Sequence, residues 1–240
     1  MPQPVDFVEI LRKNDIFLTD MQMATLQFYV DLLIEWNSRV NLISRRDYGN
    51  LWISHILHSL TPLIALEFPR ELRVLDIGTG GGLPGIPMSI VHEGMEVTLL
   101  DSIRKKTTAI EQMLVALGLS RVHVITGRAE EIGRASSHAG RYDVVIARAV
   151  APLVDLVKWS KPFLAKRQAA PTRRRIGGMG GKTGFEFPYL LALKGGDLGK
   201  EITETRLKVK DLPITEINLV FPGSENLDLV DKKLIIVEHP

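Results

Sequence analysis

The chain has 240 residues, of which 45% are hydrophobic and 24% are charged, a balance typical of one globular domain or of one domain with an extension. Its formal charge of +2 does not by itself indicate a nucleic-acid partner, and the absence of cysteine excludes disulfides, cysteine-ligated metal sites and a cysteine nucleophile. Because the chain has neither a signal-peptide pattern nor a run of about 18 apolar residues, we expect a cytoplasmic protein without membrane segments.

The first 66 residues have the pattern of a helical extension. Thr19 or Asp20 is a candidate N-cap, and apolar residues recur at helical spacing from Leu26 to Trp36. A polar turn over Asn41–Asp47 precedes a second apolar-periodic run, Leu51–Leu66, in which Pro62 can produce a kink. We therefore treat residues 1–66 as an N-terminal helical extension and residues 67–240 as the main domain.

Short apolar strands alternate with helices in the main domain. The predicted strands are Leu72–Ile77, Val97–Asp101, Val122–Ile125, Tyr142–Ala147 and Tyr189–Leu193. Helical patterns separate them, notably Ser102–Leu117 and Pro152–Leu164, which predicts an α/β fold with a mostly parallel sheet and helices on both faces. The tail differs, because Ile214–Phe221 and Leu234–Val237 are strand-like with no helix between them. We expect an antiparallel strand pair there.

A basic, glycine-rich segment interrupts this pattern at residues 165–186. Six basic residues and no acidic one lie between Ala165 and Phe185, and without them the formal charge falls from +2 to −4. Gly177–Thr183 looks like a phosphate-binding loop, but Ile176 stands where that motif needs its first glycine and no strand precedes it. We predict a mobile, peripheral loop at the amino edge of the sheet, outside the active site.

The most informative stretch runs from Asp76 to Pro87, where a strand ends in an acid and a glycine turn leads into a helix. Gly80, Gly82 and Gly85 satisfy a dinucleotide pattern, whereas Asp76 with Gly78, Gly80 and Gly82 satisfies a pattern that suits S-adenosylmethionine. An acid at the strand end repels a pyrophosphate and attracts an ammonium or sulfonium. The charge therefore favours the methyl donor over a dinucleotide.

A second acid, Asp101, ends the next strand, 25 residues after Asp76. This is about where a carboxylate accepts the ribose hydroxyls of a bound nucleoside. The same residue can also cap the helix that follows, for which Ser102 competes. Both interpretations remain open.

These residues, with others along the chain, resemble the bacterial 16S ribosomal RNA guanine-N7 methyltransferases, also called RsmG or GidB. The matching segments are Tyr29–Asn37, Asn41-Leu42, His55–Leu57, Asp76–Pro87, Leu100–Ser102, Arg128–Glu131, Ala147–Ala149 and Ala192–Gly195. The resemblance implies a class I, Rossmann-like methyltransferase that methylates one guanine of 16S rRNA in the small ribosomal subunit. It implies cofactor contacts at Gly78, Leu83, Ala129, Glu130 and Arg148.

The chain departs from the family pattern at His58, where the family usually has an acid. His55 and His58 stand three apart on a predicted helix, but with no acidic or cysteine partner we interpret them as a packed or solvated helix face and expect no metal site.

The other residue types are compatible with methylation at guanine N7. Without cysteine the chain cannot methylate pyrimidine C5, and Arg148–Pro152 is not the motif of adenine-amine methyltransferases. Guanine N7 needs no general base, so we single out no catalytic residue.

RNA binding must then come from local positive charge, because phosphate contacts dominate affinity. The candidate contacts, which follow the carboxyl ends of strands or lie in the turn of the extension, are Arg45, Arg46, Arg104, Lys105, Lys106, Arg128 and Lys194. Two other functions remain as alternatives, a dinucleotide-dependent oxidoreductase and a non-catalytic ribosome-assembly factor. We expect a monomer.

Overall fold

The molecule is an α/β sandwich built on one mixed sheet. The structure is a computed structural model that describes residues 4–44, 50–134, 137–166, 182–209, 212–225, 227, 229 and 231–239. Its strands are β1 (Leu72–Ile77), β2 (Met95–Asp101), β3 (Val122–Thr126), β4 (Val144–Arg148), β5 (Tyr189–Gly195), β6 (Ile214–Asn218) and β7 (Lys232–Glu238).

The strand order in the sheet is β3-β2-β1-β4-β5-β7-β6. The first five strands are parallel, and β7 lies antiparallel between β5 and β6. The order reverses between β1 and β4, so the carboxyl ends of these two strands form the topological switch point where open α/β sheets bind ligands. The predicted fold class and the antiparallel C-terminal pair are confirmed.

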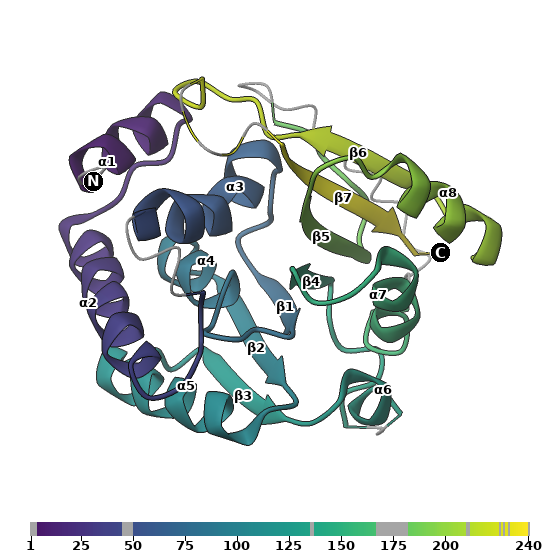
Figure 1. Cartoon of the computed structure of the whole chain (residues 1–240), viewed down its shortest axis with the longest axis horizontal. Helices are drawn as coiled ribbons and strands as arrows, with labels where there is room; N and C mark the ends of the chain where they lie inside the picture. Colours follow the sequence, from purple (N-terminus) through teal and green to yellow (C-terminus); the bar gives the residue numbers. More distant parts are fainter. Residues whose placement is uncertain are drawn as a thin grey trace.

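Helices cover both faces of the sheet, which explains why the central strands are apolar runs without alternation (Figure 1). The helical segments are α1 (Pro4–Lys13), α2 (Asp20–Asn37), a π-helical segment η2 (Trp52–Leu57), α3 (His58–Ala65), α4 (Gly85–Val91), α5 (Arg104–Leu117), α6 (Ala129–Ile132), α7 (Leu153–Ser160) and α8 (Gly199–Lys208). Figure 1 shows α1 to α5 on one side of the sheet and α6 to α8 on the other.

The N-terminal helices share their core with the sheet. Thr19 caps α2 through a capping box with Gln22, and α2 contacts α4 and α5. Buried side chains from Phe7 through Leu66 belong to the same hydrophobic cluster as those of β1, β2 and α5. The extension is therefore an integral layer of the fold.

The second predicted helix of the extension is present but irregular. Its first part, η2, is π-helical, and α3 continues through Pro62. Proline has no amide hydrogen to donate, and the hydroxyl of Thr61 instead donates a hydrogen bond to the carbonyl of His58 at 2.8 Å. This side-chain bond satisfies the carbonyl that Pro62 would otherwise leave without a helical partner.

The basic segment lies mostly outside the described residues, since 167–181 are among those the structure leaves out. Its described flanks are at the amino edge of the sheet, where Leu164 bridges to Tyr142 and Thr183 bridges to Leu66. Tyr142 precedes β4 and Leu66 precedes β1. In the part of the chain that is described, no helix is long and apolar enough to span a membrane.

Candidate functional site

The glycine loop forms the centre of the site at the carboxyl end of β1. The amides of Gly78 and Thr79 donate to the carbonyl of Leu100 on β2, at 2.7 and 3.1 Å, so the chain turns sharply as it leaves the strand. Gly78 has φ +68°, and a Cβ placed on it would lie 2.6 Å from Val150. The loop after β4 therefore packs directly on the backbone of Gly78, which only glycine permits.

Asp76, the second-to-last residue of β1, precedes this turn, and its side chain is completely buried. Its Oδ2 accepts hydrogen bonds from the Thr79 hydroxyl at 2.7 Å and from the Gly85 amide at 2.9 Å. Its Oδ1 is buried with no hydrogen-bond partner in the described structure. Burial raises the pKa of this carboxyl to about 7, although the two hydrogen bonds and the charge of Arg148 oppose the rise. The site thus offers an unused acceptor oxygen beside the glycine loop.

Asp101 ties the end of β2 to the same loop. Its Oδ2 accepts from the Gly80 amide at 3.0 Å and its Oδ1 accepts from the Ile103 amide at 2.9 Å, just before α5 begins. Gly80 itself has φ +59°, a left-handed conformation that favours glycine. The N-cap of α5 is Ile103, without a side-chain cap, so neither Asp101 nor Ser102 caps the helix as one of the two interpretations expects. The Asp101 carboxylate instead joins the turn before α5 to the glycine loop.

Tyr29 of α2 holds the loop from the other side, a contact that the sequence analysis did not identify. The buried phenol donates to the carbonyl of Gly81 at 2.9 Å. Burial raises the pKa of Tyr29 well above its usual value, so the hydroxyl remains a donor. The available signal was a polar side chain on the apolar face of α2, between Leu26 and Leu33.

The segment that follows α2 completes this side of the site. Asn37 Oδ1 accepts from the amides of Leu42 and Ile43 at 2.6 and 2.9 Å, and a Cβ on Gly80 would lie 3.3 Å from the Leu42 carbonyl oxygen. An open depression of about 470 Å³ is lined by residues 41–44. A second cavity of about 290 Å³, which Arg73, Glu96 and His123 help to line, lies at the amino ends of β1 to β3 and away from this loop.

The remaining predicted cofactor residues lie at or just after the carboxyl ends of β1, β3 and β4. Leu83 is buried, and its amide donates to the carbonyl of Thr79 at 2.9 Å within the glycine loop. Ala129 is buried and Glu130 is exposed at the start of α6, after Gly127 donates its amide to the carbonyl of Asp101 at 3.0 Å. This bond keeps the end of β3 beside Asp101.

Arg148 ends β4 and contacts the π-helical segment. Its Nη2 lies 2.9 Å from Nδ1 of His55, and its Nη1 is 3.5 Å from the His55 carbonyl oxygen. His55 and His58 are both buried, so of the packed or solvated helix face that we expected, the structure shows the packed one. Burial and the charges of Arg148 and Lys232 lower the pKa of His58 to about 3, so this imidazole is neutral at physiological pH.

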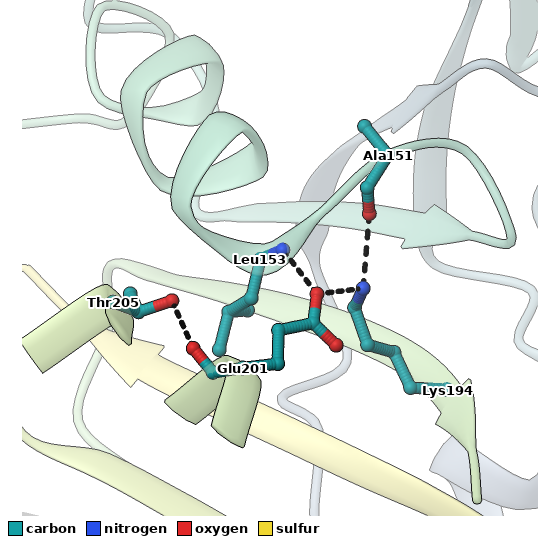
Figure 2. A network of polar contacts seen from close by, with 5 residues as sticks. All are labelled: Ala151, Leu153, Lys194, Glu201 and Thr205. Carbon is teal, nitrogen blue, oxygen red and sulfur yellow. Dashed lines mark hydrogen bonds and ion pairs between the residues drawn. The ribbon is translucent and has the colours of Figure 1, made fainter. Parts of the chain in front are cut away.

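The predicted RNA contacts differ in how far their side chains are exposed to solvent. Arg104, Lys105 and Arg128 are exposed, and Lys106 is half-buried, all just after the carboxyl ends of β2 and β3. Arg45 and Arg46 lie outside the described residues. The side chain of Lys194 is only 14% exposed, and its ammonium bonds Glu201 and the carbonyl of Ala151 (Figure 2). Because those partners use the ammonium inside the protein, we do not retain Lys194 among the proposed RNA contacts.

These groups fit S-adenosylmethionine better than a dinucleotide. The buried acceptor at Asp76 Oδ1 suits a cationic group such as the donor's ammonium, and it would repel a pyrophosphate. Asp101, which is 7% exposed, stands at the end of the neighbouring strand, where a nucleoside would extend. When bound, the cofactor would be held by these two acids and the glycine loop.

The chain is similar in sequence to known ribosomal RNA methyltransferases. The family model described as rRNA small subunit methyltransferase G matches residues 22–170. The ribosomal RNA small subunit methyltransferase G of Christiangramia forsetii is 35% identical over 199 residues, which cover 83% of this chain and 85% of the relative. That of Chlorobium luteolum is 39% identical over 189 residues, which cover 79% and 69%.

Solved structures share the fold at low sequence identity. Fibrillarin from Aeropyrum pernix, which was crystallised with natively bound S-adenosyl-L-methionine, is similar with a TM-score of 0.50 and 15% identity, over 75% of this chain and 73% of that one. A methyltransferase from Geobacter sulfurreducens gives a TM-score of 0.50 and 15% identity over 88% of both chains. These likenesses confirm the class I methyltransferase fold, and with the family match they lead to one conclusion: the chain belongs to the ribosomal RNA small subunit methyltransferase G family.

Proposed function

We propose that this protein transfers a methyl group from S-adenosylmethionine to N7 of a guanine in 16S rRNA. Family membership supports methyl transfer to small-subunit rRNA. The single observation of this structure that supports the donor is the buried Asp76 Oδ1, an unused acceptor at a glycine turn that a cationic ligand would complete. The choice of N7 rests on the resemblance and on the chemistry of the site.

Guanine N7 asks little of the protein in acid–base terms. The donor carries its methyl group on a sulfonium. The lone pair of N7 forms a bond to the methyl carbon while the carbon–sulfur bond breaks, and no proton leaves. The acids of the site are committed to binding, since Asp76 and Asp101 each hold backbone amides of the loop. Neutral His58 is shielded from solvent. The residues therefore act by orientation, which can supply roughly 7–11 kcal/mol of barrier reduction.

The RNA contacts we propose are the cations at the carboxyl edge. Arg104, Lys105 and Lys106 open α5, and Arg128 precedes α6, so both groups flank the strand ends that carry the cofactor residues. Phosphate contacts of this kind position RNA without reading its sequence. We propose Gly78, Gly80, Leu83, Ala129, Glu130 and Arg148 as further cofactor-site residues.

The test is methyl transfer in vitro. Small subunits that lack the modification are incubated with the protein and isotopically labelled S-adenosylmethionine, and the rRNA is digested to nucleosides. We expect label in 7-methylguanosine. Label in another nucleoside would refute the N7 assignment, and no transfer to either small subunits or free 16S rRNA would favour the non-catalytic assembly factor. Binding of NAD in place of S-adenosylmethionine would favour the oxidoreductase.

A further inference from the structure

Two charged side chains hold the loop that follows β4. Lys194 at the end of β5 donates from Nζ to the carbonyl of Ala151 at 2.9 Å and to Glu201 Oε1 at 2.6 Å. The same Glu201 oxygen accepts from the amide of Leu153 at 2.5 Å, at the first residue of α7 (Figure 2). The ion pair is therefore bonded to Ala151 through Lys194 and to Leu153 through Glu201.

The loop needs such support because its backbone is unfavourable. Ala149 has φ +55°, a left-handed conformation that residues with a Cβ seldom adopt and that persists only when the surroundings impose it. The register of the sheet places Arg148 opposite Leu193, so Lys194 lies one residue beyond the last pair of β4 and β5. It is thus the first residue of β5 that can reach past the end of β4 into the loop.

The loop also faces the cofactor site. Val150 is 37% exposed and its methyl groups pack on Gly78, while Ala149 is exposed beside it. Arg148 immediately precedes them at the switch point. We expect a target base that approaches a donor bound at the glycine loop to pass this apolar surface. A displaced loop would change the angle at which the base meets the methyl group.

The glycine loop, in contrast, has its own supports. Bonds from Gly78 and Thr79 to β2, from Gly80 to Asp101 and from Tyr29 to Gly81 do not involve the loop after β4. In the described structure, the hydrogen bonds that reach residues 149–153 from outside α7 come from Lys194 and Glu201. Loss of the pair should therefore disturb the acceptor side of the site more than the cofactor side.

We propose that Lys194 and Glu201 are positioning residues for methyl transfer, and that their ion pair fixes the loop after β4 against the glycine loop so that the target base is aligned with the methyl donor. Neither side chain is assigned a contact with substrate. The inference rests on the methyl-transfer activity of the proposed function but not on the choice of N7.

The chain offers a matched control in Lys233. This residue lies directly opposite Lys194 on β7 and forms an ion pair with Glu216 of β6, also at 2.6 Å, with side-chain exposures of 20% and 32% against 14% and 27%. Its partner is a neighbouring strand and not the loop. Lys233→Met therefore removes a comparable ion pair from the same region without releasing residues 149–153.

The experiment compares Lys194→Met, Glu201→Gln and Lys233→Met. Single-turnover methylation of small subunits is measured at saturating S-adenosylmethionine, and the Kd for S-adenosylmethionine is measured by calorimetry. We expect Lys194→Met to slow transfer by roughly 10- to 100-fold, because small misplacements in an active site have effects of this size. Glu201→Gln, which keeps an oxygen for the Leu153 amide, should slow transfer less. The Kd should stay near the wild-type value in both, and Lys233→Met should change neither quantity.

Equal losses in Lys194→Met and Lys233→Met, or a rate loss matched by an equal loss of S-adenosylmethionine affinity, would overturn the proposal. Hydrogen exchange of the peptide containing residues 149–153 gives a second readout that needs no activity. It should exchange faster in Lys194→Met and Glu201→Gln than in Lys233→Met, and unchanged exchange would also overturn the proposal. A wild-type protein that transfers no methyl group would overturn the proposed function and with it the positioning role, whereas unchanged exchange in an active protein would overturn the positioning role alone.

Discussion

Asp76 makes the stability of the cofactor-free protein depend on pH in a way that can be measured. Burial raises its pKa from 3.8 to about 7. Because the folded-state pKa lies above the unfolded one, the contribution of Asp76 to stability is fully present below pH 3.8 and is lost as the pH rises through 7. A shift of about three units corresponds to about 4 kcal/mol at 1.4 kcal/mol per unit, and about 3 kcal/mol of it falls between pH 5 and pH 8.

Asp76→Asn isolates this contribution. The amide keeps an oxygen for the Thr79 hydroxyl and the Gly85 amide, the two donors that Oδ2 serves, but it does not ionise. The free energy of unfolding is measured in urea at several pH values from 5 to 8 without S-adenosylmethionine. As the pH rises from 5 to 8, we expect the free energy of unfolding of the variant to increase by about 3 kcal/mol relative to that of the wild type.

Other titrating groups are common to both proteins and cancel in the difference. If the difference in unfolding free energy between wild type and variant stays constant from pH 5 to pH 8, the raised pKa assigned to buried Asp76 is refuted. If the variant does not fold, the carboxyl carbon of Asp76 can be titrated by NMR in the wild-type protein, where a midpoint near 4 would refute the same reasoning.

Four further predictions concern the same loop and its supports. S-adenosylmethionine should bind more tightly as the pH rises from about 5.5 to 8, because a cationic ligand favours ionised Asp76; calorimetry would show a pH-independent Kd if the acid does not face the ligand. Tyr29→Phe should lower stability by about 1–3 kcal/mol and weaken S-adenosylmethionine binding, since the buried Gly81 carbonyl loses its donor. Gly78→Ala should abolish detectable S-adenosylmethionine binding while circular dichroism stays native, because its Cβ would overlap Val150. Thr19→Ala should cost about 1 kcal/mol in urea unfolding and leave the transfer rate at saturating substrate unchanged, because the capping box is at the first turn of α2, where Gln22 contacts the C-terminal end of α4.

Much of the fold could be predicted because parallel strands buried on both faces are continuous apolar runs. The first predicted strand coincides with β1, and the others differ by a few residues at their ends. Those differences follow from neighbours and not from local sequence: Met95 and Glu96 join β2 because they pair with Leu72 and Arg73. The short α6 and the polar α8 have too little apolar periodicity to be recognised. They are held by contacts with α7.

The sequence indicates a candidate cofactor site because the residues proposed for it are close together in the chain or follow neighbouring strands. Asp76 and the glycines lie within one turn, and Asp101 ends the neighbouring strand, so one stretch of sequence and one spacing identify them. Tyr29 could not be identified in this way, since its partner Gly81 is 52 residues away. A polar aromatic residue in an apolar helical stripe looks the same whether it fills the core or binds a loop.

Lys194 shows that the position of a cation in the sequence does not indicate which group it contacts. It follows a strand end, as the proposed RNA contacts do, but the packing of α8 brings Glu201 within 2.6 Å of it. Whether a cation faces RNA or an internal acid depends on tertiary structure. The sequence contained both residues, seven positions apart, without indicating that they meet.

The central claim is N7 methylation of a guanine in 16S rRNA, and chemical mapping of that base tests it most directly. Borohydride reduction followed by aniline cleaves RNA at 7-methylguanine, and 16S rRNA is compared from cells that lack a methyltransferase of this family with and without expression of this protein. We predict one new cleavage site when the wild-type protein is expressed and none with Gly78→Ala. Unchanged cleavage in the presence of soluble wild-type protein would contradict the assignment.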